Sequence, residues 1–258
     1  MRFIDINAML GEWTPKRLFL QTAEDMEKEM ARLGIEKAYI MDTKAWLSEL
    51  SVGNLAAVQT AKEHPALRPV MVMTPLLEQE FGGREGAVEF ICRHRVGAVR
   101  LFPLDHNFTL HPWNTDRLFT LMSDLRMPVL IDRMEHSASF EEYDQLYRLC
   151  REYPDVPVVL LTPGYRSARM IYPILEKCAN FYVDTSLLIA YRAVEEITAC
   201  FGAEHILFGT RMPYLEPGTF VGRILYADIS EEDKEKIAYK NIVRLDSQIR
   251  YPYGGNSQ

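Results

Sequence analysis

Five charged residues stand at or near the ends of short apolar segments in this 258-residue chain: Asp5, Arg100, Asp132, Asp184 and Arg211. An isolated ionised group is costly to bury, so these side chains must pair with one another, with a ligand or with water. A carboxylate can act as a general base or nucleophile, and a guanidinium can bind a carboxylate or phosphate through two parallel hydrogen bonds. These residue types fit either a salt-bridge network or a site for a small anion.

Eight apolar, often β-branched segments position these charges and predict eight strands. They are FIDINA from Phe3, KAYIMD from Lys37, RPVMVM from Arg68, GAVRLF from Gly97, MPVLID from Met127, PVVLLT from Pro157, FYVDTS from Phe181 and ILFGTR from Ile206. They recur about every 25 to 34 residues, the length of one strand–helix unit. The segments between them carry amphipathic helical patterns, such as TAEDMEKEMARLG, which ends in a glycine stop signal.

This regular alternation predicts a single-domain (β/α)8 TIM barrel over residues 1–246, followed by a tail over 247–258. A doubly wound open sheet is the competing fold. It usually has fewer strands and a glycine-rich phosphate turn after the first one. Here the first strand leads into NAMLGEW, which has one glycine, and this favours the barrel.

The alternation of side chains along each strand predicts which residues point into the barrel, because the outer face meets apolar helices. In the first strand we expect Ile4, Ile6 and Ala8 outside and Phe3, Asp5, Asn7 and Met9 inside. The same rule places Arg100 inside, puts Leu130 with Asp132, Leu160 with Thr162, and Gly209 with Arg211 on shared sides, and groups Tyr182, Asp184 and Ser186 inside. The polar members gather near the carboxyl ends of the strands, where barrel enzymes keep their active sites.

Composition narrows the class of partner. The net charge of −7 and the absence of a basic stripe argue against nucleic acid. The apolar runs are strand-sized, so we expect no membrane span, and MRFIDINAML does not read as a signal peptide. Cys92, Cys150, Cys178 and Cys200 form no C-x-x-C pair and are expected to be reduced. These features predict a cytoplasmic protein.

The strand ends also resemble those of the amidohydrolase-related family of metal-dependent barrel hydrolases and decarboxylases. FIDINAMLG is similar to its opening D-x-H-x-H-x-G, and MPVLID and VVLLTPG to its P-V-x-x-H and H-x-G strands. FYVDTS resembles Y-x-D-x-S, and VRLFPLDHNFTLH resembles the fourth strand and its loop. ILFGTRMPY, followed by a helix with an asparagine, resembles the closing G-T-D-x-P and is the most specific match. The resemblance covers nearly the whole chain and implies a homodimer.

The departures from the family pattern lie at the positions that do its chemistry. The resemblance implies one divalent metal held by two histidines of the first strand, one histidine each from the fifth and sixth, and an aspartate of the eighth. The matching residues here are Asn7, Met9, Asp132, Thr162 and Arg211. A guanidinium stays protonated and repels a dication, so we expect neither the family metal nor any other cofactor.

Histidines outside these positions leave one other metal hypothesis open. His106 and His111 follow the fourth strand and His136 follows the fifth, so with Asp132 they could form a relocated site. Their spacing matches no standard metal motif. His64, His94 and His205 are expected to be surface or packing residues.

Two functions from different classes follow. The first is a metal-independent hydrolase, lactonase- or esterase-like, acting on a small anionic molecule, since the resemblance includes relatives that open activated lactones without a metal. Its expected catalytic residues are Asp132, Arg211, His136 and His106, and its expected substrate-binding residues are Arg100, Asn7, Thr162, Asp184, Arg133 and Tyr214. The aromatic residues Trp13, Trp113 and Tyr214 could cover the apolar part of such a ligand. The second is a catalytically inactive barrel that serves as an anion-binding or assembly module.

Overall fold

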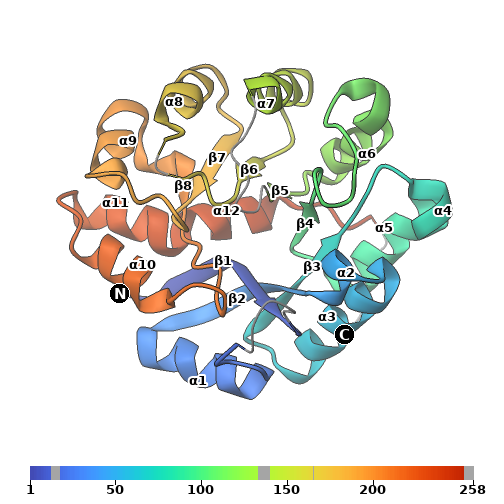
Figure 1. Cartoon of the computed structure of the whole chain (residues 1–258), viewed down its shortest axis with the longest axis horizontal. Helices are drawn as coiled ribbons and strands as arrows, with labels where there is room; N and C mark the ends of the chain where they lie inside the picture. Colours follow the sequence, from blue (N-terminus) through green and yellow to red (C-terminus); the bar gives the residue numbers. More distant parts are fainter. Residues whose placement is uncertain (13–17, 133–139, 165, 253–258) are drawn as a thin grey trace.

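Eight parallel strands form one sheet in chain order, β1 to β8, in the computed structural model, which describes residues 1–12, 18–132, 140–164 and 166–252. The strands are β1 (Phe3–Leu10), β2 (Ile35–Asp42), β3 (Leu67–Val72), β4 (Ala98–Leu101), β5 (Val129–Ile131), β6 (Val158–Leu160), β7 (Phe181–Asp184) and β8 (Ile206–Leu207). Figure 1 looks down the ring that they make, with helices outside it.

The last strand returns to the first and nearly closes the ring. Ile6 N donates to Phe208 O at 3.0 Å, and Met9 N donates to Met212 O at 2.9 Å. Ala8 and Met212 form a parallel bridge. The predicted single-domain (β/α)8 barrel is therefore confirmed.

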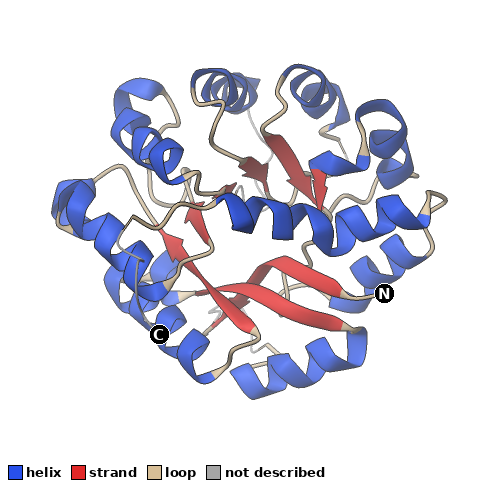
Figure 2. Ribbon diagram, turned by 180° about the vertical axis from the view of Figure 1, so that it is seen from behind, coloured by secondary structure: helices blue, strands red, loops and turns tan. Residues whose placement is uncertain are grey.

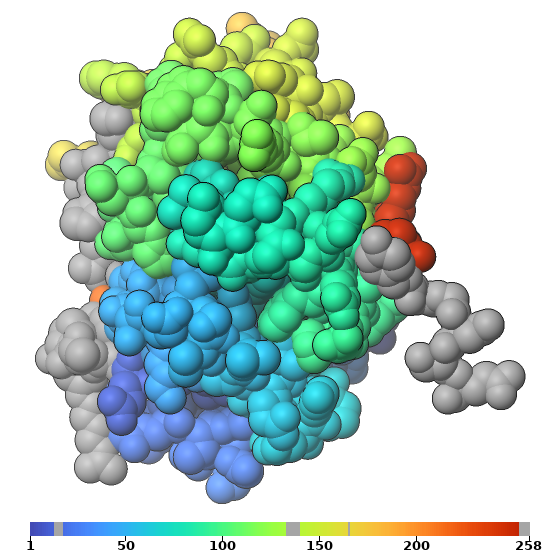
Figure 3. All heavy atoms as spheres, turned by 90° about the vertical axis from the view of Figure 1, so that its right-hand side faces the viewer, coloured from blue at the N-terminus to red at the C-terminus, as the bar shows by residue number. Residues whose placement is uncertain are grey.

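Helices form the outer layer and follow the strands along the chain. They are α1 (Ala23–Leu33), α2 (Lys44–Leu47), α3 (Leu50–Glu63), α4 (Leu77–Phe81), α5 (Gly83–His94), α6 (Pro112–Leu125), α7 (Phe140–Glu152), α8 (Ala168–Lys177), α9 (Ala193–Phe201), α10 (Pro217–Leu225), α11 (Glu231–Glu235) and α12 (Asn241–Gln248). In Figure 3 the blue-to-green segments, from α2 to α6, pack against one another on one side of the barrel. No helix among the described residues is long and apolar enough to cross a membrane.

The C-terminal helical segment covers the end of the barrel opposite the carboxyl ends of the strands. Figure 2 shows it crossing in front of the strands. The π-helical turn η2 (Lys236–Lys240) joins α11 to α12, and its Ile237 carbonyl accepts a hydrogen bond from Phe208 N at 3.1 Å. Asn241 Nδ2 donates to Ala203 O and Ile206 O at 2.8 and 2.9 Å, which ties this segment to β8. The boundary at residue 246 between barrel and tail stays a prediction.

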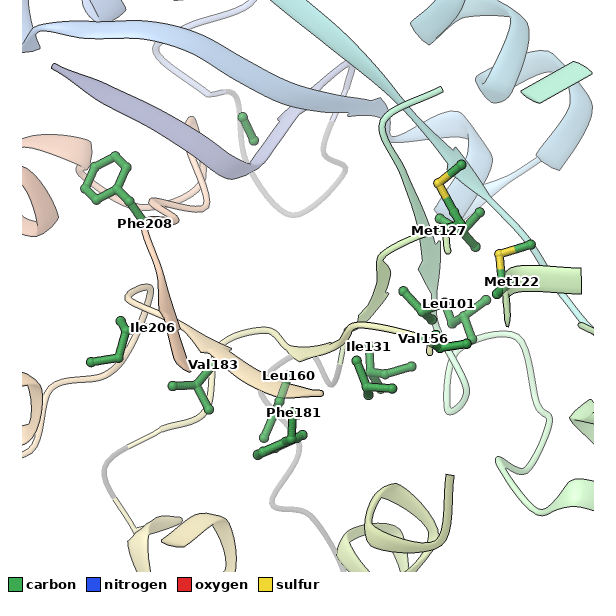
Figure 4. Close-up of a cluster of buried hydrophobic side chains, with 14 of the residues drawn as sticks. Leu101, Met122, Met127, Ile131, Val156, Leu160, Phe181, Val183, Ile206 and Phe208 are labelled. Carbon is green, nitrogen blue, oxygen red and sulfur yellow. The ribbon is translucent and has the colours of Figure 1, made fainter. Parts of the chain in front are cut away.

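Two apolar clusters lie on the two sides of the sheet. The outer cluster packs strands against helices, and Figure 4 shows Leu101, Ile131, Leu160, Val183 and Phe208 among its members. The inner cluster fills the barrel with side chains such as Met41, Leu130, Val159 and Tyr182, and it includes Ile242 and Leu245 of α12. Strand alternation therefore works as predicted for β5, β7 and β8.

The prediction for β1 was wrong at its start. Ile4 and Ile6 belong to the inner cluster, whereas Phe3 belongs to the outer one and contacts Phe208, with ring centroids 4.7 Å apart. The register of β1 against β2 shifts between Phe3 and Ile4 and again between Asp5 and Ala8. Such a bulge inserts a residue and reverses the facing of the strand on either side. Ala8 and Met9 then lie outside and inside, as expected.

Candidate functional site

Three buried ions from three strands meet at the carboxyl end of the barrel. Arg100 Nε donates to Asp132 Oδ2 at 3.0 Å, and its Nη2 binds the same oxygen. Arg211 Nη1 lies 3.3 Å from both carboxylate oxygens of Asp132. Arg100, Asp132 and Arg211 are 1%, 1% and 2% exposed. Three of the expected charges thus converge, and Arg100, Asp132 and Arg211 are called the ion triad below.

The elements fix the triad from three directions. Arg100 lies within β4 between the outward Val99 and Leu101, so strand alternation turns it inward. Asp132 follows β5, and its backbone N donates to Leu101 O at 2.9 Å, which continues the pairing with β4. Arg211 follows β8, and its Cζ lies 5.5 Å from the centre of the Tyr214 ring. The expected substrate-binding residue Tyr214 therefore stands beside the triad.

Thr162 and Arg211 both have a left-handed backbone, with φ of 50° and 58°. This conformation is rare outside glycine, and it is strained for a β-branched residue such as Thr162. Leu160 faces the helices, so simple alternation would turn Thr162 outward with it. Instead Thr162 Oγ1 lies 3.5 Å from Arg211 Nη1. The inward position of Thr162 depends on this backbone turn, and the prediction that Leu160 and Thr162 share one side was wrong.

A second buried cluster joins β1 to β7. Asn7 Nδ2 donates to Asp184 Oδ2 at 2.8 Å and lies 3.0 Å from Ser186 Oγ, and the Ser186 hydroxyl donates to the same carboxyl oxygen. The other oxygen, Asp184 Oδ1, accepts from Thr162 N at 2.8 Å. Burial raises the pKa of Asp184 to about 7, against the opposing effect of these donors. Asp184 therefore exchanges a proton near neutral pH.

The orientation of Asn7 follows from its neighbour. Nδ2 must face the carboxylate of Asp184, because an amide oxygen there would meet a second acceptor. Its Oδ1 is buried and has no hydrogen-bond partner among the described residues. The cluster is also tight, since a Cβ added at Gly209 would lie 2.5 Å from Asp184 Oδ2. Only glycine fits at that position of the closing segment.

Asp5 serves the backbone rather than the triad. Its Oδ1 accepts from Asn7 N at 2.9 Å and from Thr210 N at 3.0 Å, and the Thr210 hydroxyl binds its other oxygen. Burial raises the pKa of Asp5 to about 6. This carboxyl locks the bulged β1 to the segment after β8, so its role is structural.

His106 lies apart from the triad. Its Nε2 is 2.9 Å from Trp46 O, and because a carbonyl only accepts, Nε2 carries the hydrogen. The imidazole packs against Phe102, with ring centroids 5.5 Å apart, and Arg100 Cζ lies 5.2 Å from the centre of the same Phe102 ring. Phe102 therefore separates His106 from Arg100. No contact of His106 with Asp132 supports the expected acid–base role.

The relocated metal site receives no support from the described residues. His111 Nε2 lies 3.4 Å from Glu141 Oε1, whereas His106 Nε2 binds the carbonyl oxygen of Trp46, so the two imidazoles have different partners. No group of three or more histidine, cysteine, aspartate or glutamate residues within the described ranges could hold a metal ion. His136, Arg133 and Trp13 lie outside the described residues.

A cavity of about 260 Å³ borders the triad on the side of α7. Asp132 and Ile131 form its inner edge, and Leu110, Phe108 and Leu146 give it an apolar wall. Glu141 and Glu142 stand among its lining residues as well. It is the space next to the ion triad into which a small molecule with an apolar body could fit.

Two polar residues of the site have roles that the sequence did not predict. Thr210 had no predicted role, and Ser186 was predicted to face inward with no partner named for it. Ser186 shares Asp184 Oδ2 with Asn7, and Thr210 holds Asp5. The signal for Ser186 is its position two residues after Asp184, which puts both on one face of an extended segment. Thr210 carried no such signal, because its partner lies 205 positions away in the chain.

Comparison with known proteins gives one sequence family. A family model described as amidohydrolase matches residues 20–245. A search of curated protein sequences gave no significant match.

Solved structures share the fold over nearly the whole chain. An uncharacterized TIM-barrel protein from Bordetella bronchiseptica is 20% identical, with a TM-score of 0.75 and 96% of this chain and 99% of that chain covered. 2,6-Dihydroxybenzoate decarboxylase from Rhizobium is 13% identical, with a TM-score of 0.75 and 95% and 98% covered. A dihydroxybenzoic acid decarboxylase from a Polaromonas species, solved with bound manganese and 2-nitroresorcinol, is 14% identical, with a TM-score of 0.72 and 95% and 97% covered. The barrel is thus similar in fold to those of decarboxylases, one of which was solved with bound manganese.

Proposed function

Because the chain belongs to the amidohydrolase family, we propose that it is a member that works without the family's divalent metal and binds a small anionic molecule at the carboxyl end of the barrel. The observation that carries this proposal is the approach of two guanidiniums, those of Arg100 and Arg211, to the carboxylate of Asp132. In this proposal the guanidiniums supply the positive charge that a metal supplies in relatives.

The residues at the family's ligand positions do not fit a divalent metal. Imidazole and carboxylate are the usual ligands of Zn²⁺-like ions, and Asp132 is the one ionised ligand among the five matching residues. Arg211 Nη1 stands 3.3 Å from both of its oxygens. A dication bound there would lie next to two cations that cannot lose their protons. No step of the proposed function therefore uses a metal.

The charge balance of the triad favours an anionic ligand. Two guanidiniums and one carboxylate leave one positive charge (+2 − 1 = +1) in a site that is almost fully buried. The buried carboxyls of Asp184 and Asp5, with pKa values raised to about 7 and about 6, offset part of this charge at neutral pH and less of it as the pH falls. A carboxylate or phosphate group would neutralise this charge through charge-assisted hydrogen bonds. The cavity beside Asp132 would hold the apolar part of the ligand.

Thermal-shift and calorimetric titration with small carboxylates and phosphates tests the proposal. We expect a saturable rise in melting temperature with at least one aromatic or aliphatic carboxylate. Arg211→Lys keeps the charge and loses the planar donor fork, so it should weaken binding about tenfold or more. Arg84→Lys is the matched control, since Arg84 forms an exposed ion pair with Asp124. The proposal fails if no anion binds, or if Arg211→Lys binds as tightly as the Arg84→Lys control.

Hydrolysis of an activated ester or lactone is the second candidate function. It is favoured by Asp184, whose pKa of about 7 suits a group that exchanges protons at neutral pH. Arg211 would polarise the carbonyl, and Asp132 would orient the guanidinium. Turnover of an aryl lactone that is lost in Asp184→Asn, with carboxylate binding retained, would establish the enzyme. Turnover no faster than the uncatalysed reaction leaves a binding protein.

A further inference from the structure

A cavity of about 250 Å³ lies at the opposite end of the barrel from the ion triad. It is bounded by the start of β2, the start of β3 and the ends of α3 and α5, and β2, β3 and α3 contact one another. Its charged lining residues are Lys37, Lys62, Arg68, Arg93, His94 and Arg95. No aspartate or glutamate is among the described residues that line it. Five fixed cations thus surround one small space in a protein whose net charge is −7.

Helix polarity explains only part of this cluster. Lys62 lies in the last turn of α3, and Arg93 and His94 lie in the last turn of α5, where cations are favoured by the helix dipole. Lys37 and Arg68 belong to β2 and β3, and no such effect places them here. Their presence raises the repulsion between like charges, which a bound anion would lower.

Ion pairs with described residues compensate only part of the positive charge of this cluster. Arg68 Nη2 binds Asp246 at 2.9 Å, and Arg93 pairs with Glu89 on the exposed face of α5. Arg95 lies over the ring of Tyr251, 3.9 Å from its centre. Lys37 and Lys62 make no ion pair with any carboxylate of the described ranges.

Two buried polar atoms at this cavity have no hydrogen-bond partner among the described residues: Arg68 Nε and His94 Nδ1. Gly97 packs closely against the Arg68 side chain, because a Cβ there would lie 2.8 Å from Arg68 Nε. Burial lowers the pKa of His94, and the positive charges of Lys62 and Arg93 lower it further. These two cations therefore lie close enough to the imidazole to disfavour its protonation. An acceptor-rich anion in the cavity would satisfy Arg68 Nε and relieve this repulsion.

We infer that this cavity is a binding site for a phosphate group, either free phosphate or the phosphate of a small monoester, held by Lys37, Lys62 and Arg68. A phosphate carries up to two negative charges and accepts several hydrogen bonds at once, which matches a cluster of lysines and arginines better than a single carboxylate does. The cavity of about 250 Å³ has room for a phosphate and a small attached group. The site is independent of the proposed function at the other end of the barrel.

Titration of the full chain with inorganic phosphate tests this site. We expect saturable binding by calorimetry, and a dissociation constant at least about tenfold higher in the double variant Lys37→Gln/Lys62→Gln. Lys28→Gln is the control, because Lys28 lies on α1 with a 78% exposed side chain, and it should change binding less than about twofold. Arg211→Lys should also leave phosphate binding at this site unchanged, which separates it from the site at the ion triad.

Two further arms complete the test. Ribose 5-phosphate competing with inorganic phosphate, and binding more tightly, identifies a monoester site; weaker binding identifies free phosphate. In ¹H NMR titrations the pKa of His94 should rise when phosphate is present, since an anion reverses the effect of Lys62 and Arg93. The inference is overturned if chloride at equal ionic strength gives the same response, if the double lysine variant binds like wild type, or if no phosphate binds.

Discussion

Replacing Asp132 by asparagine should destabilise the barrel more than removing either of its arginine partners. At the observed 3.0 to 3.4 Å, each guanidinium–carboxylate contact is worth about 5 kcal/mol of attraction at an effective dielectric constant of about 20. Asp132→Asn removes the negative charge from both contacts and leaves two buried guanidiniums that repel each other. Breaking a buried ion pair from one side typically costs about 3–5 kcal/mol, and we expect the upper part of that range here.

Arg211→Met should cost less, about 2–3 kcal/mol, because Arg100 still neutralises Asp132. Arg100→Met should fall between the two, since Arg100 makes the closer contacts through Nε and Nη2. Urea denaturation followed by circular dichroism gives the three free energies of unfolding, with Arg84→Met, a surface arginine, as the control. An Arg211→Met cost equal to or above that of Asp132→Asn would refute the reasoning, as would an Asp132→Asn cost below about 1 kcal/mol.

Two other predictions concern the surroundings of the triad, and a third concerns the opposite end of the barrel. Gly209→Ala should destabilise the protein by about 1–3 kcal/mol in the same urea denaturation assay, because the added Cβ would meet Asp184. The control Gly222→Ala in α10, where no atom lies near the added Cβ, should be neutral or stabilising. The pKa of Asp184 is raised to about 7, so the folded protein keeps a proton that the unfolded chain releases near pH 4. The contribution of Asp184 to stability is therefore full below pH 4 and is lost as the pH rises to about 7. The curves of unfolding free energy against pH for wild type and Asp184→Asn should diverge in this window. Asn241→Ala should cost about 2–4 kcal/mol because it leaves the carbonyls of Ala203 and Ile206 without their donor, and an unchanged melting temperature would contradict this.

The fold could be predicted because its signals are local and repeated. Each apolar segment had the length and composition of a buried parallel strand, and each was followed by an amphipathic stretch. The inward facing of Arg100, Asp184 and Arg211 followed from the outward Val99, Val183 and Phe208 on the same strands. Regular alternation carries this information wherever the strand is unbroken.

The errors lie where the backbone departs from alternation. The bulge in β1 reverses Ile4 and Ile6, and neither residue type signals it. The left-handed turn at Thr162 brings its hydroxyl to Arg211 although Leu160 points the other way. The separation of His106 from the triad depends on the ring of Phe102, a contact that sequence spacing does not reveal. Backbone irregularities and packing between distant segments are long-range effects.

The metal content of the purified protein tests the central claim most directly. After expression and dialysis in the presence of zinc and manganese, elemental analysis should find well below one equivalent of either metal per chain, and chelator treatment should leave the melting temperature unchanged. These results follow if Arg211 and Arg100 neutralise Asp132 in place of a metal. About one equivalent of tightly held divalent metal, with a melting temperature that falls on chelation and recovers on metal addition, would contradict the account.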